Sequence, residues 1–218
     1  MCENATQDLT KVKWQDLPPR VRRDFKMKYW IFLAAACCGI VHAEGARVGL
    51  EFESEKDNKT GIINHAVTFA PGWEFSEENL INRLELLLEG NRDNRADSDG
   101  IRARENKIFV RFGHDGELSE NFAYYLRGGL GRSYNNQRSF NFAYVEPGVE
   151  YKLSHQWTWT VAFRQIDSID SADGQHVGKI ITGPSFDLNK NNELEFRYVK
   201  GNGDKDIKSV VVEYVHKY

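Results

Sequence analysis

Residues 157–164 read WTWTVAFR, with a large apolar side chain at every odd position and a small, polar or charged one between. Successive side chains of a β-strand point to opposite faces, so this period of two predicts a strand with one apolar and one polar face. The same alternation recurs in 192–201 and in 206–218. From residue 44 onward it predicts an all-β chain.

Ten such segments follow one another along the chain. We expect strands at about 46–53, 61–70, 79–90, 106–114, 120–133, 139–153, 156–166, 176–187, 192–201 and 206–218. The connections after the odd-numbered strands are polar and two of them are long, whereas the others are shorter. Short turns at one end and longer loops at the other are typical of an antiparallel up-and-down barrel. Eight or twelve strands stay open as alternatives, because 91–105 can hide strand extensions.

The polar face of these strands is rich in charge and in glycine. In a soluble, lipocalin-like barrel this face would lie outside, where its glycines would only weaken exposed strands. These are Gly49, Gly113, Gly129, Gly131 and Gly148. Turned inwards, the same glycines would make room for neighbouring Arg and Glu side chains. We therefore predict a transmembrane β-barrel at 44–218 with an apolar outer surface, and keep the lipocalin-like barrel as the alternative.

Residues 1–43 differ in composition from the rest of the chain. Five basic residues between positions 20 and 28 precede the apolar run 29–36, and residues 41–43 offer small side chains where a signal peptidase cuts. This pattern predicts a secretory signal peptide at 1–43. Met27 is an alternative start that leaves open whether 1–26 is translated.

Two other export signals remain as alternatives, a twin-arginine signal at Arg22-Arg23 and a lipoprotein cysteine at Cys37. All three cysteines fall within 1–43, so the chain beyond it has no disulfide and no thiolate metal site. That part holds 22 basic and 28 acidic residues, a net charge of −6. Mean hydropathy of −0.59 excludes a bundle of membrane helices, and the lack of a basic stripe argues against nucleic acid.

The last nine residues, 210–218, read VVVEYVHKY. This segment resembles the final strand of small outer-membrane β-barrels of Gram-negative bacteria, whose terminal aromatic residue is read by the barrel-assembly machinery. Tyr218 stands in place of the commoner Phe, and His216 stands where an apolar residue is usual. The resemblance implies a monomer that lies in the bacterial outer membrane and contacts its lipid and lipopolysaccharide.

Within that class, residues 144–151, YVEPGVEY, and the size of the chain resemble the monomeric oligogalacturonate-specific porins. Members of that family typically have twelve strands and basic tracks along the pore, whereas about ten strands are expected here. The resemblance implies a channel.

Aromatic residues gather beside the short turns and the chain end. Such residues form girdles where a barrel meets the membrane–water interface. We predict this role for Trp73, Tyr124, Tyr151, Trp157 and Tyr218, with Phe122 and Phe186 beside them.

Nine bases and nine acids fall on the inward face of the predicted strands. Paired rows of opposite charge would orient a polar solute in a narrow channel, with arginines as bidentate donors to its carboxylate or sulfate groups. We expect passage of small hydrophilic or charged solutes; a structural or surface-interaction barrel with a filled lumen is the alternative, and a membrane-embedded hydrolase the third. The predicted selectivity rows are Arg111, Arg127, Arg164 and Arg197, opposed by Glu146, Glu150 and Glu195.

No residue pattern indicates catalysis, a metal ion or a cofactor. His114-Asp115 lies at a tight turn, and His176 has only Asp170 and Asp173 near it at the long-loop end. The carboxylates of 93–99 and of 167–173 resemble half of a calcium loop but lack the later bidentate Glu. We expect a protein that is not an enzyme.

Overall fold

In this computed structural model the described residues are 45–76, 78–96, 102–135, 139–170, 176–204 and 206–218, without the side chains of 93–96, 102–104 and 135. The chain divides into two units, Met1–Gly39 and Ile40–Tyr218, and the description concerns the second. The predicted signal peptide lies outside the described residues. So do Asp97, Asp99 and Asp173 of the calcium-like segments.

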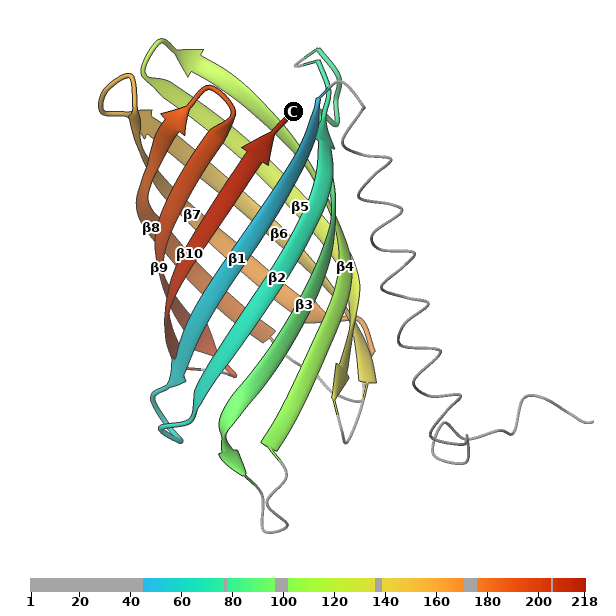
Figure 1. The fold of residues 1–218 in the computed structure, drawn as a ribbon. Coiled ribbons are helices and arrows are strands. Elements are labelled where there is room, and N and C mark those ends of the chain that lie inside the picture. Colours follow the sequence, from blue (N-terminus) through green and yellow to red (C-terminus); the bar gives the residue numbers. More distant parts are fainter. Residues whose placement is uncertain (1–44, 77, 97–101, 136–138, 171–175, 205) are drawn as a thin grey trace, which may run out of the picture. The chain divides into compact units, whose positions relative to one another are not determined.

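The described residues form ten β-strands, as the alternation predicted (Figure 1). Among them, no helix is long and apolar enough to cross a membrane. The strands are β1 (Ala46–Asp57), β2 (Ile63–Glu74), β3 (Arg83–Ala96), β4 (Arg102–Ser119), β5 (Phe122–Asn135), β6 (Ser139–Lys152), β7 (Trp157–Ser168), β8 (His176–Asn189), β9 (Asn192–Gly203) and β10 (Ile207–Lys217).

Several strands extend beyond the segments that the sequence predicted. Residues 91–105, expected to be a loop, include the end of β3 and the start of β4, which stay paired from Asn91↔Glu105 to Arg92↔Arg104. Strand pairing continues there without apolar alternation, because residues beyond the lipid need no apolar face. The extensions lengthen the strands and leave their number unchanged.

The ten strands close into one antiparallel barrel, in which each strand pairs with its neighbours in sequence and β1 pairs with β10. The closing ladder runs from Arg47↔Lys217 to Asp57↔Ile207. Tyr218 lies at the end of the barrel where β1 begins, and its N–H donates to the carbonyl oxygen of Ala46 at 2.9 Å (Figure 1). The start of β1 and the C-terminus therefore both lie at the short-turn end.

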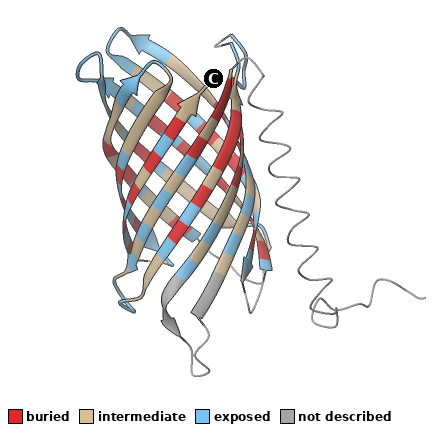
Figure 2. Ribbon diagram, in the orientation of Figure 1, coloured by how far each residue is buried: buried red, intermediate tan, exposed pale blue. Residues whose placement is uncertain are grey.

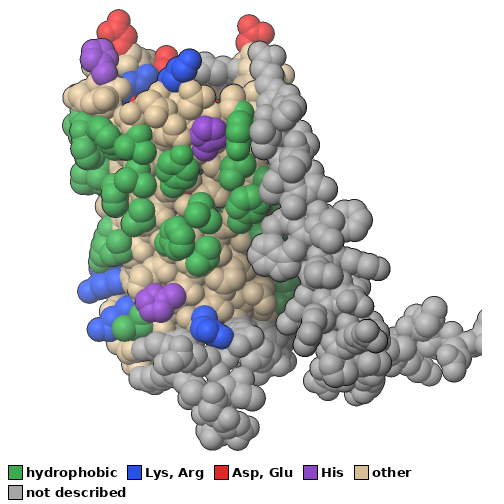
Figure 3. Space-filling model, in the orientation of Figure 1, with side chains coloured by type: hydrophobic (Ala, Val, Ile, Leu, Met, Phe, Trp, Pro, Cys, Tyr) green, Lys and Arg blue, Asp and Glu red, His purple; other side chains and the backbone are tan. Residues whose placement is uncertain are grey.

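Alternation divides the side chains between the outer surface and the lumen, as Figure 2 shows along each strand. In β7 the outward Trp159 and Val161 are 42% and 47% exposed, whereas the inward Ala162, which follows Val161, is 4% exposed. Hydrophobic side chains cover the middle of the face seen in Figure 3, and charged ones gather near its two ends. The outer surface is therefore the apolar one, which rules out the lipocalin-like alternative.

Three prolines lie within strands, at Pro71, Pro147 and Pro184. Proline has no N–H to donate, so it can pair fully on one side only. At Pro184 the ladder to β9 is interrupted between Thr182 and Ser185, while Pro184 still pairs with Trp159 of β7. Strand β8 therefore continues through the Gly183-Pro184 pair.

The arrangement of β7 predicts opposite responses to arginine at two adjacent positions. Val161→Arg puts a charge on the outer surface and should cost about 2–4 kcal/mol of stability if this residue lies near the bilayer midplane. Thr160→Arg points inwards, where its neighbour in the ladder is Glu150, and should cost less. Denaturant unfolding of both variants in lipid vesicles measures the difference, and equal losses would contradict this register.

Candidate functional site

All seven predicted selectivity residues point into the lumen. Arg111, Arg127, Arg197 and Glu146 are buried, and Arg164, Glu150 and Glu195 are partly buried. The structure brings several of them together, but as three ion-pair groups that mix acids and bases. Their role in selectivity stays a prediction.

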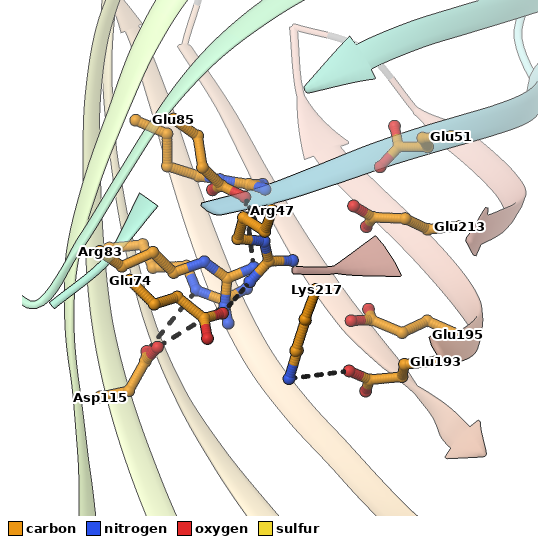
Figure 4. Close-up of polar contacts among 12 residues, drawn as sticks. Arg47, Glu51, Glu74, Arg83, Glu85, Asp115, Glu193, Glu195, Glu213 and Lys217 are labelled. Atoms are coloured by element: carbon orange, nitrogen blue, oxygen red, sulfur yellow. Dashed lines mark hydrogen bonds and ion pairs between the residues drawn. The ribbon is translucent and has the colours of Figure 1, made fainter. Parts of the chain in front are cut away.

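The first group surrounds Glu85 of β3, which is 1% exposed. Arg111 from β4 donates to its Oε2, while Arg47 Nε and Arg83 Nη2 each lie 3.4 Å from its Oε1. Arg47 also contacts Glu74 at 2.6 Å (Figure 4). One fully enclosed carboxylate is thus held by three guanidinium groups.

The second group surrounds Glu146 of β6, which is also 1% exposed. Arg164 from β7 donates to Glu146 Oε2, and Arg127 Nη1 lies 3.9 Å from Oε1. Arg127 is in addition 3.9 Å from Asp115, which links this group to Arg83 of the first one.

The third group is centred on Arg197 of β9. This guanidinium lies 2.7 Å from Glu51 and 3.5 Å from Glu195, and it also donates to Glu213. The acids Glu51, Glu213, Glu195 and Glu193 follow one another in Figure 4, and the last of them is 3.6 Å from Lys217.

The three groups do not form two separate rows. Glu146 lies between two arginines on the basic side, and Arg197 lies among acids. Interleaving follows from the cost of removing charge from water, which is repaid only when each buried ion has close opposite charges and hydrogen bonds. These side chains occupy the lumen toward the short-turn end.

A cluster of apolar side chains inside the barrel was missed by the sequence analysis. It consists of Phe140, Phe142 and Tyr144 of β6, packed against Phe109 of β4 and Ile166 of β7. The Phe109 ring packs edge-on against Phe142 and Tyr144, with centroid distances of 5.7 and 6.1 Å. We name this set the aromatic wall.

The glycines of β5 make the aromatic wall fit. A Cβ at Gly129 would collide with the Tyr144 ring, and one at Gly131 would collide with Phe109 and approach Phe142. The expectation that inward glycines make room for charged side chains is thus wrong for these two and for Gly148, which lies against the Tyr125 ring. It is confirmed for Gly113, beside Arg127, and for Gly49, beside Glu213. Aromatic rings take up the volume that the glycines of β5 leave.

The aromatic wall had a signal in the sequence. Glu146 was assigned to the lumen, and Tyr144, Phe142 and Phe140 share its face because they precede it by even numbers of residues. Large apolar side chains on that face do not match the polar lumen that the sequence predicted.

A cavity of about 110 Å³ lies in the lumen toward the long-loop end. On one side it is bounded by the aromatic wall, and on the other by glutamates of β1, with Lys107 and Lys179 between. Lys107 pairs with Glu89 at 2.7 Å, and Lys179 reaches Glu55 at 3.5 Å. The polar residues that line the cavity are Glu51, Glu53, Glu55, Asn64, Thr68, Glu89, Asn91, Glu105, Lys107, Arg111, Arg164 and Lys179.

The five predicted girdle residues all lie at the short-turn end. The rings of Trp157 and Phe186 are tilted against each other with a centroid distance of 4.7 Å, and those of Tyr151 and Phe122 with one of 6.3 Å. Tyr124 and Tyr218 each have a histidine ring beside them. Trp73 is the fifth, one residue before the end of β2. Their contact with the lipid interface stays a prediction.

Among the described residues, His114 and His176 contact partners other than those named from the sequence. His114 contacts the Asn79 carbonyl oxygen and the Tyr124 hydroxyl, at 3.2 and 3.3 Å. His176 Nδ1 lies 2.7 Å from Asp167 on the adjacent strand, and both side chains are exposed. Within the described part of the chain, no three His, Cys, Asp or Glu residues are grouped to hold a metal ion.

A closed antiparallel barrel with an apolar outer surface and a charged interior defines an outer-membrane β-barrel protein, located in the bacterial outer membrane. In this class the short turns face the periplasm and the longer loops face outwards. No protein-family model matches the chain, and a search of curated proteins found no match.

The β domain of the Bordetella autotransporter BrkA is similar with a TM-score of 0.52 and 10% identity, covering 80% of this chain and 99% of that chain. An outer-membrane channel from Pseudomonas putida is similar with a TM-score of 0.51 and 8% identity, covering 81% of this chain and 96% of that chain. The KdgM porin, solved with disordered oligogalacturonate, has a TM-score of 0.43 and 7% identity, covering 79% of this chain and 99% of that chain. At these identities the similarity concerns the fold alone.

The enclosure of Glu85 predicts a large effect of neutralising it. Glu85→Gln leaves three guanidinium groups without their shared carboxylate and should destabilise the barrel by about 3–5 kcal/mol. Glu193→Gln breaks a longer and more exposed pair with Lys217 and should cost below about 1 kcal/mol. Unfolding of both refolded variants in vesicles tests this, and a cost for Glu85→Gln as small as that for Glu193→Gln would contradict it.

Proposed function

We propose that this barrel is a narrow porin-like channel for small hydrophilic or charged solutes, closed at rest by the ion pairs of its periplasmic half. The observation that carries the proposal is the row of acids that leads from the cavity at Glu51 past Glu213 and Glu195 to Glu193 (Figure 4). A charged row of this kind gives an ion successive partners along the lumen.

Shared partners give the ion pairs a way to open. Arg197 has three acids within reach, and Arg47 and Arg127 have two each. A base that can change partners need not lose all opposite charge when a solute passes, so the desolvation cost of opening is reduced.

At rest the carboxylates of Glu85 and Glu146 occupy guanidinium donors that the sequence assigned to a solute. The acids facing the cavity are then the groups left to meet an incoming ion. This supports a preference for cations and leaves the arginines as the barrier to them.

A filled structural barrel is the second candidate function. It is favoured by the complete enclosure of Glu85 and Glu146, since side chains pack the lumen around them. Current across a planar bilayer distinguishes the two candidates.

Arg127→Glu tests the channel because it reverses a charge in the closed half. We expect discrete conductance steps from the wild type, and a several-fold rise in cation over anion permeability in Arg127→Glu, because a positive barrier becomes an attractive site. Arg127→Gln should shift the preference in the same direction by less. Reversal potentials in a salt gradient measure both.

Arg132→Glu is the matched control. Arg132 lies on the same strand but faces outwards near the long-loop end, with Ser139 as its partner, and its reversal should leave ion preference unchanged. Each sample must first show the gel-mobility change between boiled and unboiled protein that marks a folded barrel. If the folded wild type conducts no current, the channel is contradicted and the filled structural barrel is favoured. Release of fatty acid or peptide fragments would indicate a hydrolase.

A further inference from the structure

The cavity near the extracellular end combines features that the channel proposal does not use. One side is the aromatic wall, and the other carries the carboxylates of Glu51, Glu53 and Glu55 on consecutive inward positions of β1. An aqueous passage needs no such apolar surface, whereas a binding pocket for an amphipathic ligand does.

The charge of the cavity favours a cation. Five glutamates and four bases line it, but Arg111 and Arg164 are satisfied by Glu85 and Glu146, which lie outside the lining. Glu51 is likewise paired with Arg197, which lies outside the lining, so the remaining charged lining is four glutamates against two lysines. Each lysine already has a glutamate in contact. A positively charged group would therefore be attracted and an anion repelled.

The aromatic wall supplies a surface for the apolar part of such a ligand and for its charge. Aromatic ring faces attract cations, and here Arg164 already lies over the Tyr144 ring at 5.2 Å. The Tyr144 side chain is 7% exposed and lines the cavity, yet its hydroxyl has no hydrogen-bond partner among the described residues. Buried polar groups are normally hydrogen-bonded, so this hydroxyl indicates a missing partner.

The size of the cavity limits the ligand. About 110 Å³ is somewhat smaller than the roughly 150 Å³ of an engineered apolar cavity that holds benzene. A single six-membered ring is therefore the upper limit within the cavity itself. A short side chain on that ring has to extend into the open part of the lumen, and an oligomeric or multi-ring ligand is too large.

We propose that this cavity is a binding site for a small aromatic amine, whose ring packs on the aromatic wall and whose ammonium group faces the glutamates of β1. A hydroxyl on the ring would provide the partner that Tyr144 lacks. The inference rests on the cavity and does not require that the barrel conducts.

Calorimetry on the full-length barrel, folded in a neutral detergent, tests the proposal with 2-phenylethylamine as the probe and empty micelles as the blank. Phenylacetate keeps the ring and reverses the charge, and butylamine keeps the charge and removes the ring. We expect both to bind at least tenfold more weakly than the probe. Equal heats for probe, phenylacetate and empty micelles would overturn the proposal.

Variants locate the binding. We expect Glu53→Gln and Phe142→Ala each to weaken the binding of 2-phenylethylamine several-fold. Leu130→Ala on the outer surface should leave that binding unchanged. Tyr144→Phe keeps the ring and the packing, so it should preserve binding of 2-phenylethylamine while removing the advantage of tyramine, which adds a ring hydroxyl. Probe binding that is unchanged in folded Glu53→Gln and Phe142→Ala, or an advantage of tyramine that survives Tyr144→Phe, would place the ligand elsewhere.

Discussion

Pairing of the backbone is the constraint on which the rest of this structure depends. Lipid offers no partner to an N–H or a carbonyl group, so a sheet that crosses the membrane must have no open edge. The ladder between β1 and β10 removes the last edge. Once it is formed, the period of two assigns every side chain of ten strands to lipid or lumen, and a slip of one residue would exchange the two sets.

The interior is filled in two different ways along its length. In the periplasmic half, arginines and glutamates from adjacent strands, and from strands separated by one, neutralise one another around Glu85, Glu146 and Arg197. Toward the extracellular end, rings from β4 and β6 pack over the glycines of β5. Each buried charge needs several opposite charges close to it, so the ion pairs fill their part of the lumen. The flat rings of the aromatic wall leave a gap beside them. The cavity lies where the second kind of filling meets the glutamates of β1.

Hydrogen bonding also extends to polar atoms on the outer surface. The Trp159 indole N–H donates to the Thr182 hydroxyl on the adjacent strand at 3.0 Å, so a polar atom on the outer surface has a partner. At Pro184 one ladder opens while the other holds. The indole donor is thus paired, and Pro184 adds no unpaired donor because it has no N–H.

Much of the fold followed from the sequence because alternation is a local property. WTWTVAFR at 157–164 already separates lipid-facing from inward residues, and its recurrence gave the number of strands and the lumen position of every predicted selectivity residue. The extensions of β3 and β4 were not predicted, since strand pairing beyond the lipid leaves no apolar signal. The aromatic wall escaped prediction because its residues share a face with Glu146 but not its polarity.

The sequence by itself determined the fold class, the apolar outer surface and the set of residues that point inwards. Only the tertiary structure decided which of those residues meet. Lys179 reaches Glu55 across 124 positions of sequence, and Arg197 reaches Glu51 across 146. Such pairs depend on barrel closure and on the curvature and stagger of ten strands, which bring distant residues to one height in the lumen. No local pattern contains that information, because the spacing along one strand is the same whatever lies opposite.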